Sequence, residues 1–232
     1  METSVYKIYD RRKKWGKAIV DINRMKEFET NYLPYMQSLK KAKILDVGCG
    51  QGFMLDFVRR QGFRNAIGVD VSENLVKLCR AKGHNVVCAD ARDFLKNTAE
   101  QFDIIVMNDI LEHFNKKDAI ELLKLIHSKM RAGGLLLVKT CNSNYPFSNY
   151  YRYADLTHET IYEEESLGYL LELTGFRVHF IGDFKAFPRN LIRRWIRRLV
   201  LKTYQLVFLV CVGRKLCEMN IFAVARTPTS AY

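Results

Sequence analysis

The chain has 232 residues, of which 48% are hydrophobic and 27% charged, the composition of a globular protein large enough to bury a substantial core. Its six cysteines include no C-x-x-C pair, which argues against a disulfide framework and against a zinc site. No apolar segment follows the N-terminus and no run of about 18 apolar residues occurs, so we expect neither a signal peptide nor a membrane-spanning helix.

The net charge of +12 is unevenly distributed along the chain. Residues 1–43 carry eleven basic and five acidic side chains, residues 44–184 carry sixteen and nineteen, and residues 185–217 carry nine basic and no acidic ones. A positive field on the two flanks suits an anionic membrane, a nucleic acid or a phosphorylated substrate.

Taken in order, the chain begins with a basic segment, residues 1–41, that we expect to form a helical cap. Apolar and β-branched runs then predict strands at 43–48, 65–71, 85–90, 102–108 and 134–140. Apolar residues at helical spacing, followed by glycine, predict helices with glycine C-caps at 53–62, 73–83 and 118–134. This alternation predicts an α/β domain with a mostly parallel sheet, whose core is residues 42–184.

Two more strands are predicted near the C-terminus. The runs 176–184 and 220–227 have strand composition and are separated only by a long basic stretch, so we expect them to pair antiparallel. The stretch between them, residues 185–219, is predicted as an insertion, and residues 220–232 as the final strand and tail.

A glycine turn, LDVGCGQG at residues 45–52, follows the first predicted strand and opens the first helix. Gly48, Gly50 and Gly52 allow the backbone to approach a ligand where a Cβ would collide. The G-x-G-x-G spacing differs from the dinucleotide-binding G-x-G-x-x-G pattern, and such a turn can also serve only tight packing of strand against helix.

Two aspartates favour the ligand interpretation. Asp70 ends the second predicted strand, 20 residues after Gly50, where a carboxylate can accept hydrogen bonds from both hydroxyls of a ribose. Asp90 ends the third predicted strand, where it can accept from an exocyclic amine such as adenine N6. Because the carboxyl ends of parallel strands meet at one edge of the sheet, the turn and the two carboxylates predict a nucleoside-binding crevice.

Five segments together resemble the successive motifs of the class I S-adenosylmethionine-dependent methyltransferases: ILDVGCGQG, GVDVSENLV, CADARDF, FDIIVMNDILEHF and MRAGGLLLVKT. The residue patterns of these motifs most resemble those of methyltransferases from polysaccharide and O-antigen gene clusters. The resemblance implies a Rossmann-like, seven-stranded, mostly parallel sheet with a reversed seventh strand, and S-adenosylmethionine as cofactor. It implies that Asp70 holds the ribose and Asp90 the adenine. The other implied cofactor contacts are Asp46, Gly48, Cys49, Gly50, Gly52, Val71, Ala91 and Asn108.

In such an enzyme the acceptor must lie in line with the methyl group, and an oxygen acceptor also needs a base for its proton. The segment NDILEHF, which follows the fourth predicted strand, supplies Asn108, Asp109, Glu112 and His113. His113 is a candidate base, although Glu112 and His113 can equally cap or pack the helix that follows.

A second candidate segment, residues 144–167, is rich in tyrosine and suits a ring-shaped polar ligand such as a sugar. The expected substrate contacts are Tyr145, Tyr150, Tyr151, Arg152 and Tyr153. In its D-x-T-H element, His158 is the expected general base, oriented by Asp155, because a free imidazole has a reference pKa of about 6.5. This element resembles one found in methyltransferases of polysaccharide clusters and of quinone pathways. The alternative is that Asp155 and His158 only cap the next helix.

The expected function is an S-adenosylmethionine-dependent O-methyltransferase that acts on a glycan or lipid-linked acceptor at the cytoplasmic face of the membrane, without a metal ion. The chain has no [DNS]-P-P-[YFW] motif after the fourth strand and no Pro-Cys nucleophile, which disfavours the common nucleic-acid methylation chemistries. The alternatives are a quinone or phenol O-methyltransferase, an RNA methyltransferase and a binding protein without catalysis.

The insertion begins with alternating pairs of arginines and apolar residues. On a helical wheel its apolar half collects Leu191, Ile192, Trp195, Ile196, Leu199 and Val200, and its basic half collects Arg193, Arg194, Arg197 and Arg198. Such a cationic amphipathic helix with a tryptophan is typical of segments that lie in the membrane interface. We therefore expect residues 191–215 to contact an anionic membrane, and the protein to be cytoplasmic and peripheral on the inner face of the plasma membrane. A homodimer interface, a cover for the sheet edge and an RNA-binding surface are the alternatives.

Overall fold

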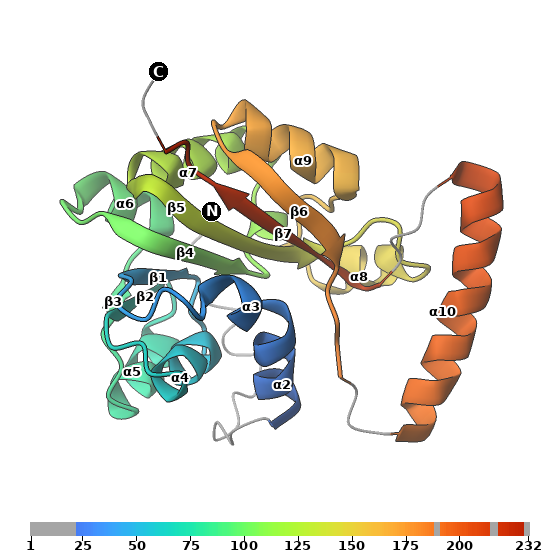
Figure 1. Ribbon diagram of the computed structural model, residues 1–232, viewed down its shortest axis with the longest axis horizontal. Coiled ribbons are helices and arrows are strands. Elements are labelled where there is room, and N and C mark those ends of the chain that lie inside the picture. The colour runs from blue at the N-terminus through green and yellow to red at the C-terminus, as the bar shows by residue number, and fades with distance from the viewer. Residues whose placement is uncertain (1–21, 188–190, 214–217, 230–232) are drawn as a thin grey trace.

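The structure is a computed structural model that describes residues 22–187, 191–213 and 218–229 (Figure 1). Its centre is a seven-stranded sheet in the order β3-β2-β1-β4-β5-β7-β6. The strands are β1 (Ile44–Val47), β2 (Ala66–Asp70), β3 (Val86–Cys88), β4 (Phe102–Asn108), β5 (Met130–Cys141), β6 (Arg177–Asp183) and β7 (Asn220–Arg226). β7 runs antiparallel to both of its neighbours, whereas all pairs from β3 to β5 are parallel. The predicted α/β fold, with its reversed seventh strand, is confirmed.

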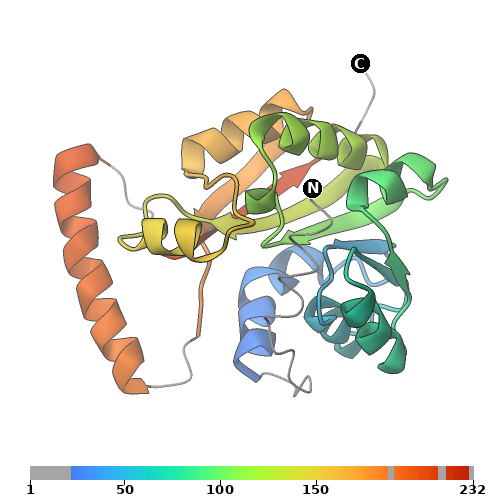
Figure 2. The same ribbon diagram turned by 180° about the vertical axis from the view of Figure 1, so that it is seen from behind.

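Helices cover both faces of this sheet (Figure 1 and Figure 2). One face carries α6 (Ala91–Asn97), α7 (Lys116–Ser128) and α9 (Glu164–Leu173). The other face carries α2 (Ile22–Asn31), α3 (Leu33–Met36), α4 (Phe53–Arg60) and α5 (Glu73–Ala81). The predicted N-terminal cap is thus helical where it is described, while its first part, residues 1–21, lies outside the described residues.

Side chains alternate along β1, so this strand contributes residues to the hydrophobic cores on both faces of the sheet. Leu45 and Val47 pack in the cluster that includes α7, and Ile44 packs in the cluster that includes α2 and α4. All four residues of β1 are buried, because β1 pairs with β2 on one side and with β4 on the other. Asp46 is therefore held inside the protein by the strand that carries it.

Two of the three predicted helix ends are confirmed and one is wrong. α4 and α5 are followed by Gly62 and Gly83, whose φ angles of 84° and 77° are left-handed and favour glycine. The helix predicted over 118–134 ends instead at Ser128, because Met130 already pairs with β4 and begins β5. A register shift at this end of the β4–β5 pair absorbs the extra residues of β5.

The insertion between β6 and β7 contains one continuous helix of 22 residues, α10 (Leu191–Val212), as predicted. It stands to one side of the sheet in both views (Figure 1 and Figure 2). None of the helices in the described ranges is long and apolar enough to cross a membrane. Three short elements are absent from the sequence-based prediction: α6, the 3-10 helix η1 (Leu111–His113) and α8 (Ser148–Ala154).

Candidate active site

The glycine turn joins β1 to α4 at the edge where the parallel strands end. Gly48, Gly50 and Gly52 have φ angles of 67°, 53° and 77°. A Cβ at Gly48 would lie 2.0 Å from Cδ1 of Ile110, and one at Gly52 would lie 2.9 Å from Sγ of Cys79. A Cβ at Gly50 would meet no atom of the described residues within 4 Å. Gly48 and Gly52 therefore serve packing, whereas Gly50 borders open space that a ligand can use.

Asp46 lies beside this turn and is only 2% exposed. Its Oδ2 atom has no hydrogen-bond partner among the described residues. Burial raises the pKa of Asp46 well above its ordinary value, and the neighbouring Cys79 and Asp70 raise it further. A buried carboxyl oxygen without a partner is costly, and an ammonium group from a ligand would satisfy it and favour the charged carboxylate.

Asp70, at the end of β2, ties that strand to the glycine turn. Its Oδ2 accepts a hydrogen bond from the amide of Gly50 at 2.8 Å, and its Oδ1 accepts from the amide of Ser72 at 2.9 Å. Each carboxylate oxygen can accept from more than one donor, so these bonds are compatible with further bonds to ribose hydroxyls. Cys49 is buried, and a hydrogen bond with Cys79, together with burial, raises the pKa of its thiol. The Cys49 side chain therefore faces the core, and only its backbone remains for a ligand.

Asp90 follows β3 and caps α6. Its Oδ1 accepts a hydrogen bond from the amide of Arg92 at 2.8 Å, and its side chain is 36% exposed. Val71, which follows β2 at the same edge of the sheet, is exposed, and Ala91 is half-buried. Asp90, the implied adenine contact, and the implied cofactor contacts Val71 and Ala91 thus lie where two neighbouring parallel strands end.

Asn108 ends β4 and accepts a hydrogen bond from the hydroxyl of Tyr32. Tyr32 is fully buried, and burial, together with the charge of Asp109, raises the pKa of its hydroxyl well above the ordinary value. Tyr32 is not among the site residues predicted from the sequence. The signal that could have found it is the aromatic pair Phe28 and Tyr32, four residues apart, whose ring centroids lie 5.4 Å from each other in the core. Asp109 has a φ of 55°, which is uncommon for a residue other than glycine, and forms an ion pair with Lys139 at 2.6 Å.

Glu112, in η1, is 1% exposed and connects this region to β5. Its carboxyl group accepts from the hydroxyl of Thr140 at 2.9 Å and from the thiol of Cys141 at 3.5 Å. Its backbone carbonyl accepts from the amides of Glu159 and Thr160, at 2.8 and 3.1 Å. Burial raises its pKa to about 8, so near neutral pH the carboxyl group is mostly protonated. Glu112 therefore holds the segment around residue 160 against η1, in line with the packing interpretation.

His113 is connected to Asp155 through Thr157. Its Nδ1 lies 2.9 Å from Oγ1 of Thr157 and 3.3 Å from the carbonyl oxygen of the same residue. The Thr157 hydroxyl donates its proton to Oδ1 of Asp155 at 2.6 Å, so it can only accept from His113. Nδ1 of His113 therefore carries the ring proton, and Nε2 is the basic nitrogen. Burial, and then the nearby His158, lowers the pKa of His113.

His158 packs edge-to-face on His113, with ring centroids 4.9 Å apart. Its Nδ1 lies 2.9 Å from the carbonyl oxygen of Tyr151, which can only accept, so Nε2 is again the basic nitrogen. The guanidinium of Arg152 donates to the carbonyl of His158. The structure thus brings both predicted histidines together. The Tyr151 carbonyl orients the His158 ring, whereas Asp155, its expected partner, acts on His113 through the hydroxyl described above.

α8 and the turn before it gather the expected substrate contacts. The ring of Tyr151 lies 5.8 Å from that of Tyr145 and 5.4 Å from that of Tyr150. Tyr150 and Tyr153 are 69% and 79% exposed, so their rings are accessible to a ligand. The Arg152 guanidinium lies 5.8 Å from the Tyr153 ring. This segment can therefore offer aromatic faces and a fixed cation next to the histidine pair.

Comparison with known proteins identifies the family. A family model described as a methyltransferase domain matches residues 21–180, which is more than half of the chain. A crystal structure of an S-adenosylmethionine-dependent methyltransferase from Archaeoglobus fulgidus is similar over 96% of this chain and 99% of that one, with a TM-score of 0.70 and 25% identity. The chain belongs to the class I S-adenosylmethionine-dependent methyltransferases.

Among curated proteins, this methyltransferase is similar to ubiquinone biosynthesis O-methyltransferases. The match to the one from Pseudomonas aeruginosa has 28% identity and covers 62% of this chain and 61% of the relative. The match to the one from Coxiella burnetii has 33% identity and covers 49% of this chain and 50% of the relative. The chain thus spans only half to three fifths of the length of these relatives. The similarities do not support the narrower resemblance to polysaccharide gene clusters.

The residues at the carboxyl edge of the sheet fit S-adenosylmethionine, the methyl donor of this family. Oδ2 of Asp46, which is buried without a partner among the described residues, suits the ammonium group of the methionine end. The open space at Gly50 leaves room for a ligand, and the Asp70 carboxylate beside it would be the group that accepts hydrogen bonds from the ribose hydroxyls. Asp90, whose side chain is partly exposed, and the exposed Val71 would be the residues next to the adenine ring.

Proposed function

We propose that this protein is an O-methyltransferase and that its acceptor is a hydroxyl group on a small aromatic ring. The observation that carries the proposal is the pair of imidazoles, His113 and His158, whose Nδ1 atoms are both held by oxygen acceptors. In each neutral ring the basic Nε2 remains for a proton. A hydroxyl acceptor needs such a base, because its oxygen loses a proton as it takes the methyl group.

When bound, S-adenosylmethionine supplies a sulfonium methyl group that a nucleophile can displace in line. The protein's own contribution is to position the acceptor oxygen and to take its proton at Nε2 of His158. His113, with its lowered pKa, is neutral near neutral pH and packs on the His158 ring. The hydrogen bond that Nδ1–H of His158 donates to the Tyr151 carbonyl keeps the ring in the tautomer that can accept a proton at Nε2.

The acceptor class rests on two observations. The relatives from Pseudomonas aeruginosa and Coxiella burnetii are named for O-methylation in ubiquinone biosynthesis, which favours a phenolic acceptor. The tyrosine rings of α8 can stack on a planar aromatic ring. A glycan or lipid-linked glycan is the second candidate, because the exposed Tyr150 and Tyr153 can equally stack on a sugar face. An acceptor of this second class has no support from the similar proteins.

The test is an acceptor screen. The purified protein is incubated with S-adenosylmethionine that carries an isotopically labelled methyl group. Two matched acceptor panels are used, one of catechol-type phenols and one of free and lipid-linked saccharides. Mass spectrometry locates the label. Transfer to a phenolic oxygen supports the proposal, and transfer to saccharides alone puts the second candidate in its place. Cofactor binding by calorimetry without transfer to either panel contradicts O-methylation and favours a binding protein.

A further inference from the structure

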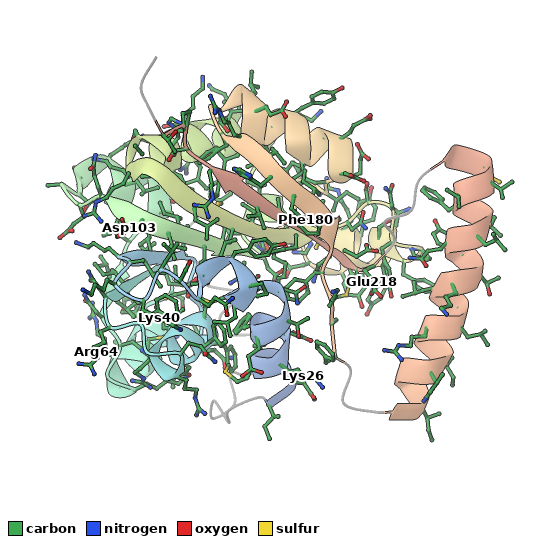
Figure 3. All side chains as sticks on the ribbon, viewed as in Figure 1. Lys26, Lys40, Arg64, Asp103, Phe180 and Glu218 are labelled. Carbon is green, nitrogen blue, oxygen red and sulfur yellow. The ribbon has the colours of Figure 1, made fainter. Side chains whose placement is uncertain are left out.

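The helix α10 is not part of the site described above, and no strand or other helix of the described chain packs extensively against it. Figure 3 shows side chains along α10 that point away from the sheet. Six apolar side chains at positions i, i+3, i+4, i+7, i+14 and i+18 form one stripe along the helix, and each is at least 59% exposed. This open stripe consists of Ile192, Trp195, Ile196, Leu199, Leu206 and Val210.

The opposite side of the same helix is different. Leu201 is 6% exposed, and Tyr204 and Phe208 are half-buried, with their rings stacked at a centroid distance of 5.5 Å. At 3.6 residues per turn, these positions lie roughly half a turn away from the open stripe. This side of α10 is thus partly covered, with Leu201 buried, whereas the open stripe is an apolar side in contact with water, which calls for an occupant.

The charge around the open stripe indicates which occupant fits it. Arg198 and Lys202 are exposed and lie four residues apart on one flank of the stripe. The Arg198 guanidinium lies 6.0 Å from the Trp195 ring. Residues 185–217 contain nine basic and no acidic side chains. A second copy of α10 would bring like charges together without a carboxylate to pair them, whereas an anionic bilayer offers negative headgroups and an apolar interior at once.

We propose that α10 lies flat on an anionic phospholipid surface. The open stripe enters the interface, the Trp195 ring sits at the headgroup level, and Arg198 and Lys202 contact the phosphates. The helix spans roughly 33 Å along the surface at 1.5 Å per residue, so the stripe and the cations act over the same length. This proposal does not depend on the acceptor proposed above, because it concerns a surface outside the active site.

The test measures sedimentation of the full chain with vesicles of phosphatidylcholine alone and with vesicles of phosphatidylcholine mixed with phosphatidylglycerol. The wild-type protein is expected to bind only the anionic vesicles, and to bind less as salt rises. The double variant Arg198→Glu/Lys202→Glu should partition at least about 30-fold more weakly, since each basic residue near the surface contributes about fivefold. Trp195→Ala/Leu199→Ala should also lose binding. Cofactor affinity by calorimetry should stay at the wild-type value in both.

Matched controls separate the stripe from general surface effects. Lys116→Glu/Lys117→Glu in α7 makes the same charge change at exposed positions, and Tyr169→Ala/Leu173→Ala in α9 removes comparable exposed apolar area. Both controls should bind vesicles as the wild type does. Equal binding to neutral and anionic vesicles, or no binding at low salt, overturns the proposal. So does a dimeric mass in lipid-free solution that Trp195→Ala/Leu199→Ala converts to a monomer, because a second copy then covers the stripe.

Discussion

The proposed cofactor side and the proposed acceptor side of the active site are built in different ways. On the cofactor side, Asp70 reaches the amide of Gly50, 20 residues away, within one β-α-β unit. On the acceptor side, His113, at the end of the short helix η1, reaches Thr157, which lies in a loop 44 residues away. The first arrangement follows from local motifs at the ends of strands, whereas the second exists only after the chain has folded.

This difference predicts a division of labour. Substitutions among the strand-end residues should change cofactor affinity, and substitutions around the two histidines should change turnover with cofactor affinity intact. Glu112 stands between the two sides, because its carboxyl group bonds to β5 and its backbone to the acceptor segment. The predictions below test this division, beginning with the largest expected effect.

Removal of the proposed base should have the largest effect. His158→Ala should lower the turnover rate by roughly 10²–10⁴, because the acceptor proton loses its positioned acceptor. Single-turnover kinetics measures the rate, and calorimetry should show wild-type cofactor affinity. His179→Ala, at an exposed histidine of β6, is the control and should leave both unchanged. Near-normal turnover in His158→Ala would transfer the role of base to His113.

On the cofactor side, Asp70→Ala should weaken S-adenosylmethionine binding by roughly 10²-fold or more, since hydrogen bonds to a charged carboxylate are lost. The variant also frees the amides of Gly50 and Ser72, which Asp70 holds in the turn. Asp93→Ala, at an exposed carboxylate of α6, should bind the cofactor normally. Titration calorimetry that finds equal affinities in the two variants would remove Asp70 from the cofactor site.

Two glycines of the same turn should separate stability from affinity. Gly48→Ala places a Cβ against Ile110 and should cost about 1–3 kcal/mol more in unfolding free energy than Gly50→Ala, because both carry left-handed strain but only the first is overpacked. Gly50→Ala should instead lower cofactor affinity, as its Cβ enters the open space. Urea unfolding and calorimetry measure the two quantities. The double variant Gly48→Ala/Ile110→Ala should recover part of the lost stability; no recovery would contradict the steric cause.

The same difference explains which parts of the molecule are predictable from sequence. The seven strands are apolar and regular, and Asp46, Asp70 and Asp90 lie at or next to strand ends. The fold and the edge of the sheet proposed to bind the cofactor can therefore be predicted from the local sequence pattern. Tyr32 and Thr157 cannot, because their partners Asn108 and His113 are 76 and 44 residues away. The predicted helix 118–134 is too long at its C-terminal end, because Met130 pairs with β4 and so belongs to the sheet. This pairing is a tertiary contact that the local sequence pattern does not show.

The smallest predicted effect tests the connection from Asp155 to His113. Thr157→Val keeps the shape of the side chain and removes the hydroxyl that donates to Asp155 and accepts from His113. The backbone carbonyl of residue 157 still lies 3.3 Å from Nδ1 of His113, so the ring keeps one acceptor. We therefore expect a loss in turnover of at most about tenfold, the value of one hydrogen bond, with cofactor affinity unchanged.

A structural role alone would predict something else for this residue. If Thr157 positions His113 for proton transfer, Thr157→Val should also move the pH profile of turnover, and Thr157→Ser, which restores the hydroxyl, should return both rate and profile to those of the wild type. If Thr157 only packs the segment, Thr157→Ser should be at least as damaging as Thr157→Val, since it removes a methyl group from a buried site. Which of the two variants has the higher turnover rate therefore decides whether Asp155 acts on the chemistry through His113 or only on the fold.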